Sequence, residues 1–89
     1  MDIVIDFKNI QDKQSLYVYL KDVFCDCEFY GSNLDALMEV LMCLKDKNII
    51  IRNVDVLKDN LGDYAQKLVN TFSLAKKENK KIDVIIEGV

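Results

Sequence analysis

The sequence predicts one α/β domain over residues 1–89, with about four helices around a three-stranded parallel sheet. Three short runs rich in isoleucine and valine, at 2–7, 48–54 and 82–87, are separated by two long stretches of helical periodicity. Connections of this length favour parallel strands joined by right-handed crossovers. A chain this short buries only roughly 60–65% of its unfolded surface, so it forms a single core.

The first half of the chain predicts one strand and two helices. Asp2–Phe7 is a short β-branched run typical of a buried strand. Asp12 can cap the next helix, in which apolar residues recur at helical spacing over Leu16–Phe24. The stretch Cys25–Asn33 breaks this pattern and is expected to be a loop. A second helix is predicted from about Leu34 to Leu44.

The second half repeats this order. Asn48–Val54 is the second predicted strand, and Asp55–Asn60 is expected to form a short helical turn. A longer helix follows over Asp63–Glu78, and Ile82–Glu87 is the last strand. Because the strands are nearly continuous in apolar residues, both faces of the sheet are expected to be at least partly covered.

Charge excludes some functions and favours others. Residues 1–44 hold eight carboxylates and three lysines, whereas residues 45–89 hold nine basic and seven acidic groups. An acidic first half argues against nucleic-acid binding, which needs a basic surface, and is compatible with a basic partner. No apolar run is long enough for a membrane span, no signal pattern is visible, and no glycine-rich phosphate loop occurs.

The three cysteines are Cys25, Cys27 and Cys43, and histidine is absent. A zinc site would therefore lack ligands, and reduced, partly buried thiols are the simpler expectation. No metal or cofactor is expected. Free thiols without a signal pattern favour the cytoplasm.

An acidic segment contains the candidate functional residues. Residues 22–44 hold five carboxylates and no lysine or arginine. On the helix, one stripe carries the leucines that must pack on the sheet. A different stripe alternates Asp35 and Glu39 with Met38 and Met42, at spacing i, i+3, i+4, i+7. This pattern is compatible with an interaction surface for a basic partner, and equally with an ordinary acidic surface.

The loop before this helix leaves two alternatives open. Either one ring of Phe29 and Tyr30 is buried and the other lies beside Asp35, or both cover the edge of the core. Ser32 or Asn33 can cap the helix.

The segment Phe29–Leu41, FYGSNLDALMEVL, closely resembles the signature of the barstar family: an aromatic pair, glycine, a variable residue, then Asn-Leu-Asp-Ala-Leu. Chain length and element order are similar too, so the resemblance covers essentially the whole chain. It implies a barstar-like fold and inhibition of a secreted guanyl-specific ribonuclease such as barnase. The expected partner is a basic microbial ribonuclease in a 1:1 complex, and no catalysis is expected of the chain itself.

The resemblance also implies roles for individual residues. Phe29 occupies the place of an aromatic on the ribonuclease's base-binding side, and Gly31 and Asn33 shape the loop. Asp35 faces basic residues of the enzyme. Glu39 stands where the family usually has aspartate, the mimic of a substrate phosphate. The partner-binding residues expected are Phe29, Tyr30, Gly31, Asn33, Leu34, Asp35, Met38, Glu39, Met42, Cys43 and Leu44.

Two other functions remain open at this stage. The acidic surface would also suit an immunity or binding module for a different basic toxin or enzyme. An enzyme using Asp35 and Glu39 as a metal-binding pair is less favoured, because neither a histidine nor a nucleophile beside a base supports it.

Overall fold

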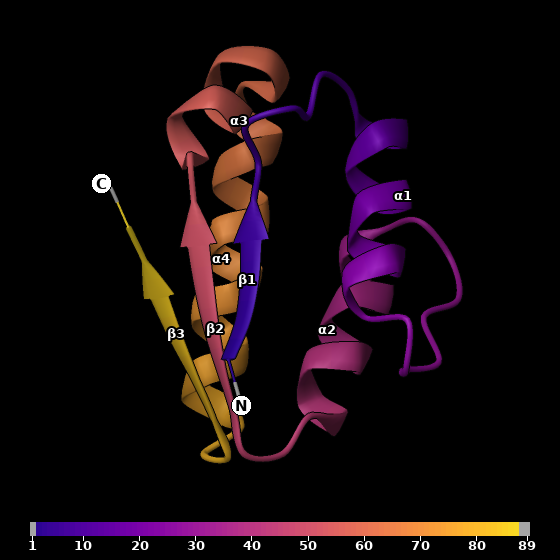
Figure 1. The fold of residues 1–89 in the computed structure, drawn as a ribbon, viewed down its shortest axis with the longest axis vertical. Coiled ribbons are helices and arrows are strands. Elements are labelled where there is room, and N and C mark those ends of the chain that lie inside the picture. The colour runs from indigo at the N-terminus through magenta and orange to yellow at the C-terminus, as the bar shows by residue number, and fades with distance from the viewer. Residues whose placement is uncertain (1, 88–89) are drawn as a thin grey trace.

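Three parallel strands form one sheet in the order β1-β2-β3 in the computed structural model, which describes residues 2–87 (Figure 1). The strands are β1 (Asp2–Asp6), β2 (Lys47–Arg52) and β3 (Ile82–Ile86). The helices are α1 (Lys13–Val23), α2 (Leu34–Cys43), α3 (Val54–Leu61) and α4 (Asp63–Glu78). The α/β fold class predicted from the sequence is confirmed.

The second crossover differs in detail from the prediction. The expected short turn at Asp55–Asn60 is the complete helix α3, and β2 stops at Arg52. Asn53 ends the strand because it has a φ of 60°, a left-handed conformation that asparagine tolerates better than most residues. Its Nδ2 donates to Asp6 Oδ1 at 2.7 Å, which ties the end of β2 to the end of β1.

The helices cover only one face of the sheet, so the expectation that both faces would be partly covered is wrong. Each strand is added on the same side of the previous one, and right-handed crossovers then place both helical connections on the same face. On the other face, Val4, Ile50 and Ile85 pair across the strands. Val4 is 43% exposed and Ile85 is 46% exposed.

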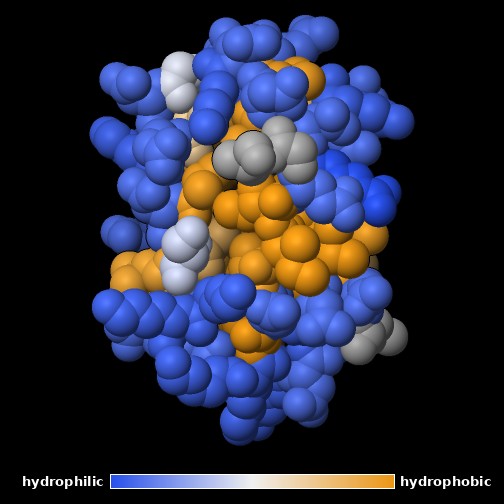
Figure 2. Space-filling view, turned by 90° about the vertical axis from the view of Figure 1, so that its left-hand side faces the viewer, coloured by the Kyte–Doolittle hydropathy of each residue, from blue (hydrophilic) through white to orange (hydrophobic). Residues whose placement is uncertain are grey.

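The core lies between the covered face of the sheet and the helices. Ile5, Ile49, Ile51 and Val84 alternate with the exposed residues of their strands and are buried. In Figure 1, α4 passes behind β1 and β2, while α1 and α2 lie beyond the β1 edge. Viewed from the β3 side, a hydrophobic patch is bordered above and below by hydrophilic residues (Figure 2). None of the helices in residues 2–87 is long and apolar enough to cross a membrane.

Candidate protein-binding site

The helix α2 begins at a well-defined cap. Asn33 Oδ1 accepts a hydrogen bond from the backbone N–H of Ala36 at 2.7 Å, so Asn33, not Ser32, is the capping residue. Asp35 lies in the first turn, where the positive end of the helix dipole favours a carboxylate. Gly31 has a φ of +89°, a backbone conformation that a side chain would strain. These three residues fix how the loop enters the helix.

The aromatic pair before the helix is divided between the core and the surface. Phe29 is 8% exposed and packs edge-on against Tyr17, with ring centroids 6.4 Å apart. The Phe24 ring is at the same centroid distance. Tyr30 is 78% exposed. One ring is therefore buried and the other exposed, as the first alternative requires, and Phe29 offers little surface to a partner. The placement of Tyr30 beside Asp35 stays a prediction.

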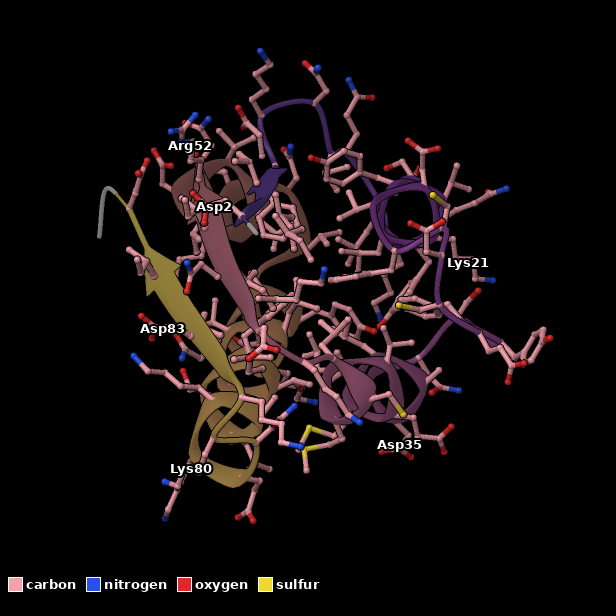
Figure 3. All side chains as sticks on the ribbon, turned by 60° about the horizontal axis from the view of Figure 1, so that its bottom comes forward. Asp2, Lys21, Asp35, Arg52, Lys80 and Asp83 are labelled. Atoms are coloured by element: carbon pink, nitrogen blue, oxygen red, sulfur yellow. The ribbon has the colours of Figure 1, made fainter. Side chains whose placement is uncertain are left out.

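The two stripes predicted on α2 are present, with one correction. Ala36, Leu37, Val40 and Leu41 are buried against the rest of the core. Asp35, Glu39 and Met42 are exposed, and Asp35 points outward on the outer side of the helix (Figure 3). Met38 was expected on the exposed stripe but is half-buried and packs against the core. Around the helix, Met38 lies between the exposed Met42 and the half-buried Leu34, at the edge of the stripe nearest the core.

The remaining residues expected to bind a partner differ in exposure. Cys43 is exposed at the last position of α2. Leu34 is half-buried, and Leu44 is buried just after the helix. Leu34 and Leu44 therefore serve mainly to hold α2 in place. Gly31 and Asn33 are exposed in the loop.

Carboxylates on the loop and on α2 are outside the salt bridges that the structure contains within residues 2–87. Within residues 2–87, none of the carboxylates of Asp26, Glu28, Asp35 and Glu39 forms a salt bridge; the ion pairs found there lie on the sheet and α4. The nearby Lys21 instead donates to Ser32 Oγ at 3.2 Å. We refer to the exposed residues Asp26, Glu28, Tyr30, Asp35, Glu39 and Met42 as the acidic face. Its negative potential is not neutralised from within the described part of the chain.

A pocket of about 440 Å³ lies between the loop and α2. Tyr30 forms one side and Glu39 another. The carboxylates of Asp26 and Glu28 line it as well, together with the thiols of Cys27 and Cys43. Such a pocket can receive a cationic side chain, because it offers carboxylate oxygens beside an aromatic ring.

A wider hollow of about 940 Å³ lies along α1, around Val18 and Tyr19. Lys21 lines it together with acidic residues, including Asp22, so its charges are mixed. Asp22 thus lies outside the acidic face. The smaller pocket on α2 is the better candidate site because its charges have one sign.

Asn79 supports the site from a distant part of the chain, and no motif in the sequence points to it. The side chain is buried, and its Nδ2 donates to Leu41 O and Leu44 O at 2.9 Å each. These carbonyls belong to the last turn of α2 and the residue after it, where the regular bonding of the helix ends; Leu41 O also accepts a long bond of 3.4 Å from Leu44 N. Asn79 Oδ1 accepts from Lys81 N at 3.1 Å. The residue between α4 and β3 therefore fixes the end of the candidate binding helix.

We expect Asn79→Ala to lower the free energy of unfolding by about 1–3 kcal/mol, because it removes the two buried side-chain hydrogen bonds to Leu41 O and Leu44 O. A urea melt measures this change. Asn70→Ala is the matched control: Asn70 is exposed on α4 and bonds only within its helix, to Gln66. Its replacement should stay within about 0.5 kcal/mol. Equal free energies of unfolding for the two variants would contradict the supporting role of Asn79.

The described residues do not bring together three or more histidine, cysteine, aspartate or glutamate side chains in an arrangement that could hold a metal ion. Asp35 and Glu39 are one helical turn apart, and their carboxylates are left with solvent as their surroundings.

The chain is similar to known proteins in two comparisons. A family model described as "Barstar (barnase inhibitor)" matches residues 1–87. A protein of Bacillus subtilis (strain 168) named "Putative ribonuclease inhibitor YrdF" is 31% identical over 88 residues, which cover 96% of this chain and 97% of the relative. The family model extends over all the strands and helices of residues 2–87, and so includes the whole acidic face.

Proposed function

The chain belongs to the barstar family, and we therefore propose that it inhibits a ribonuclease. The target we propose is a secreted, basic, guanyl-specific microbial ribonuclease, bound in a 1:1 complex through α2 and the loop before it. The observation that carries the proposal is the acidic face, where four carboxylates form no salt bridge within residues 2–87.

The proposed mechanism is competitive occupation of the nuclease active site. An enzyme that cleaves RNA must hold a phosphate with cationic side chains. Glu39, in the middle of α2, presents a carboxylate on a rigid helix and replaces that phosphate. Asp35, one turn earlier, pairs with a second basic group. Because a carboxylate side chain contains no phosphodiester bond, the nuclease binds it but has nothing to cleave.

Apolar groups around the charges exclude water from the complex. Tyr30 is the most exposed ring of the loop, and Met42 is 41% exposed one turn beyond Glu39. An exposed aromatic ring and a flexible thioether supply contact area beside the ion pairs, and exclusion of water strengthens those pairs. We propose Tyr30, not the buried Phe29, as the main aromatic contact. The chain itself has no catalytic step in this proposal.

The proposed compartment is the cytoplasm, where the inhibitor would protect the cell from its own nuclease. All three cysteines are free thiols in the structure. Unpaired thiols are typical of a reducing compartment.

The direct test is a titration of guanyl-specific ribonucleases with the purified chain, while RNA cleavage is measured. We expect activity of at least one basic ribonuclease to fall linearly to zero at one equivalent of inhibitor. Failure to inhibit any of them would contradict the proposal. Binding to a basic toxin that does not cleave RNA would instead favour the alternative function, an immunity module for another toxin.

Salt dependence checks the electrostatic part of the same complex. Association should slow as ionic strength rises to the physiological range, where the screening length is about 8 Å, because the acidic face attracts its partner over a distance. Dissociation should change much less. Stopped-flow mixing at several salt concentrations measures both rates, and an association rate independent of salt would argue against docking through the acidic face.

A further inference from the structure

Two cysteines from different elements line the pocket of the acidic face. Cys27 belongs to the loop, and Cys43 is the last residue of α2. Neither is assigned a role by the inhibitory mechanism above. Cys25 lines the hollow along α1, on a different part of the surface. The pocket therefore combines a pair of thiols with the carboxylate of Glu39.

We propose that Cys27 and Cys43 form a reversible disulfide that closes this pocket and weakens binding to the ribonuclease. The effect on binding rests on the function proposed above, whereas formation of the disulfide does not. The co-reactant is a low-molecular-weight disulfide such as glutathione disulfide.

The surroundings of Cys27 favour this pairing over one with Cys25. Burial is the main cause that raises the pKa of the Cys27 thiol, followed by the charge of Asp26 and then by the neighbouring Cys43, ahead of Cys25. Cys27 also lines a second cavity, of about 160 Å³, on its other side. The Cys27 side chain is half-buried and packs against the core, and it faces Cys43 across the pocket that both residues line.

The reaction has two exchange steps. The exposed Cys43 reacts first, because its thiol is open to solvent whereas the raised pKa keeps Cys27 protonated. The Cys43 thiolate attacks one sulfur of glutathione disulfide, the sulfur–sulfur bond breaks, and one glutathione leaves as a thiolate. The Cys27 thiolate then attacks the Cys43 sulfur and releases the second glutathione. The two protein thiols lose two electrons and two protons, which the two glutathione thiols receive.

The bond would tie the loop to the last turn of α2. Its two sulfurs belong to the loop wall and the α2 wall of a pocket that Tyr30 and Glu39 also line. Joining these walls narrows the space open to a cationic side chain of the partner. It also fixes the loop, which can then no longer adjust to the partner surface.

The test begins with the chain alone, incubated with glutathione disulfide and analysed by mass spectrometry. We expect peptide mapping to join Cys27 to Cys43 in the wild type, whose exposed Cys25 also takes up glutathione. In Cys25→Ser, which lacks this third thiol, the mass should fall by two hydrogens. In Cys27→Ser the reaction should stop at a glutathione adduct on Cys43, which identifies the attacking thiol. A bond between Cys25 and Cys27, or no internal bond at all, would overturn the pairing.

The second measurement compares binding of oxidised and reduced protein to a ribonuclease inhibited by the reduced chain. We expect oxidation to raise Kd at least tenfold in the wild type and in Cys25→Ser, and dithiothreitol to restore it. In Cys43→Ser, the same treatment should leave Kd within about twofold of that variant's reduced form. Equal Kd values for oxidised and reduced wild type would overturn the closing of the pocket. Disulfide mapping needs no partner, so a failure of the proposed function can be told apart from a failure of the thiol pair.

Discussion

Glu39→Ala should raise the Kd for the ribonuclease more than any other single truncation on the acidic face. Glu39 is exposed in the middle of α2 and lines the pocket there. A hydrogen bond to a charged group contributes about 1.5–3 kcal/mol, and each 1.4 kcal/mol is tenfold in affinity, so we expect an increase of about 10- to 150-fold. Isothermal titration or inhibition kinetics measures it.

Glu39→Ala should not lower the stability of the fold. Glu39 and Asp35 are like charges one turn apart, which disfavours the helix by about 0.2–0.5 kcal/mol. Removing Glu39 relieves this repulsion, so the melting temperature should hold or rise. Asp22→Ala is the matched control, an exposed carboxylate of the same acidic segment that lines the other hollow. If Asp22→Ala weakened binding more than Glu39→Ala, the centre of the interface would lie elsewhere.

Leu37→Ala should have the largest effect on stability among substitutions in α2. Its side chain is fully buried. Removing buried methyl and methylene groups costs the lost transfer energy and leaves a cavity, together about 2–5 kcal/mol. For a domain of this size each kcal/mol corresponds to about 4–8 °C in Tm. Urea and thermal melts should therefore show a strong destabilisation, and binding should fall only through loss of folded protein.

Met42→Ala is the control on the exposed side of the same helix. With Met42 41% exposed, its truncation should cost less than about 0.5 kcal/mol of stability and should weaken binding. The loss of stability in Met38→Ala should lie between those of Met42→Ala and Leu37→Ala, because Met38 is half-buried against the core. If Met42→Ala melted like Leu37→Ala, the outer side of α2 would have to be core, and the acidic face would shrink to the carboxylates and the loop.

Local signals predicted much of the fold. Each strand is a short β-branched run, and each long helix has its apolar residues at helical spacing, so the element order needed no tertiary information. The cap at Asn33 and the glycine at Gly31 also act within a few residues of sequence. For the same reason the position of α2, and the stripe that carries Glu39, could be predicted closely.

Features set by tertiary packing could not be predicted in this way. The sequence of an apolar strand does not show whether one face of the sheet or both faces are covered. β-branched residues occur in either case, because they also favour the strand backbone itself. The strand order β1-β2-β3 places both helical connections on one face, so Val4 and Ile85 on the other face are exposed. The burial of Met38 depends on its neighbours across the helix, and Asn79 acts through carbonyls 38 and 35 positions earlier in the chain.

The hydrogen bonds from Asn79 to the distant end of α2 affect the order in which the molecule folds. The pairing of β1 with β2 already joins residues 46 positions apart, as in the hydrogen bond from Asn48 Nδ2 to Asp2 Oδ1. Contacts so distant in sequence form slowly, because the entropy of closing the intervening chain must first be overcome. The carbonyls at the end of α2 receive their hydrogen bonds later still, because the donor, Asn79, follows α4 in the chain. During synthesis, residue 79 must therefore leave the ribosome before the end of α2, and with it the acidic face, takes its final shape.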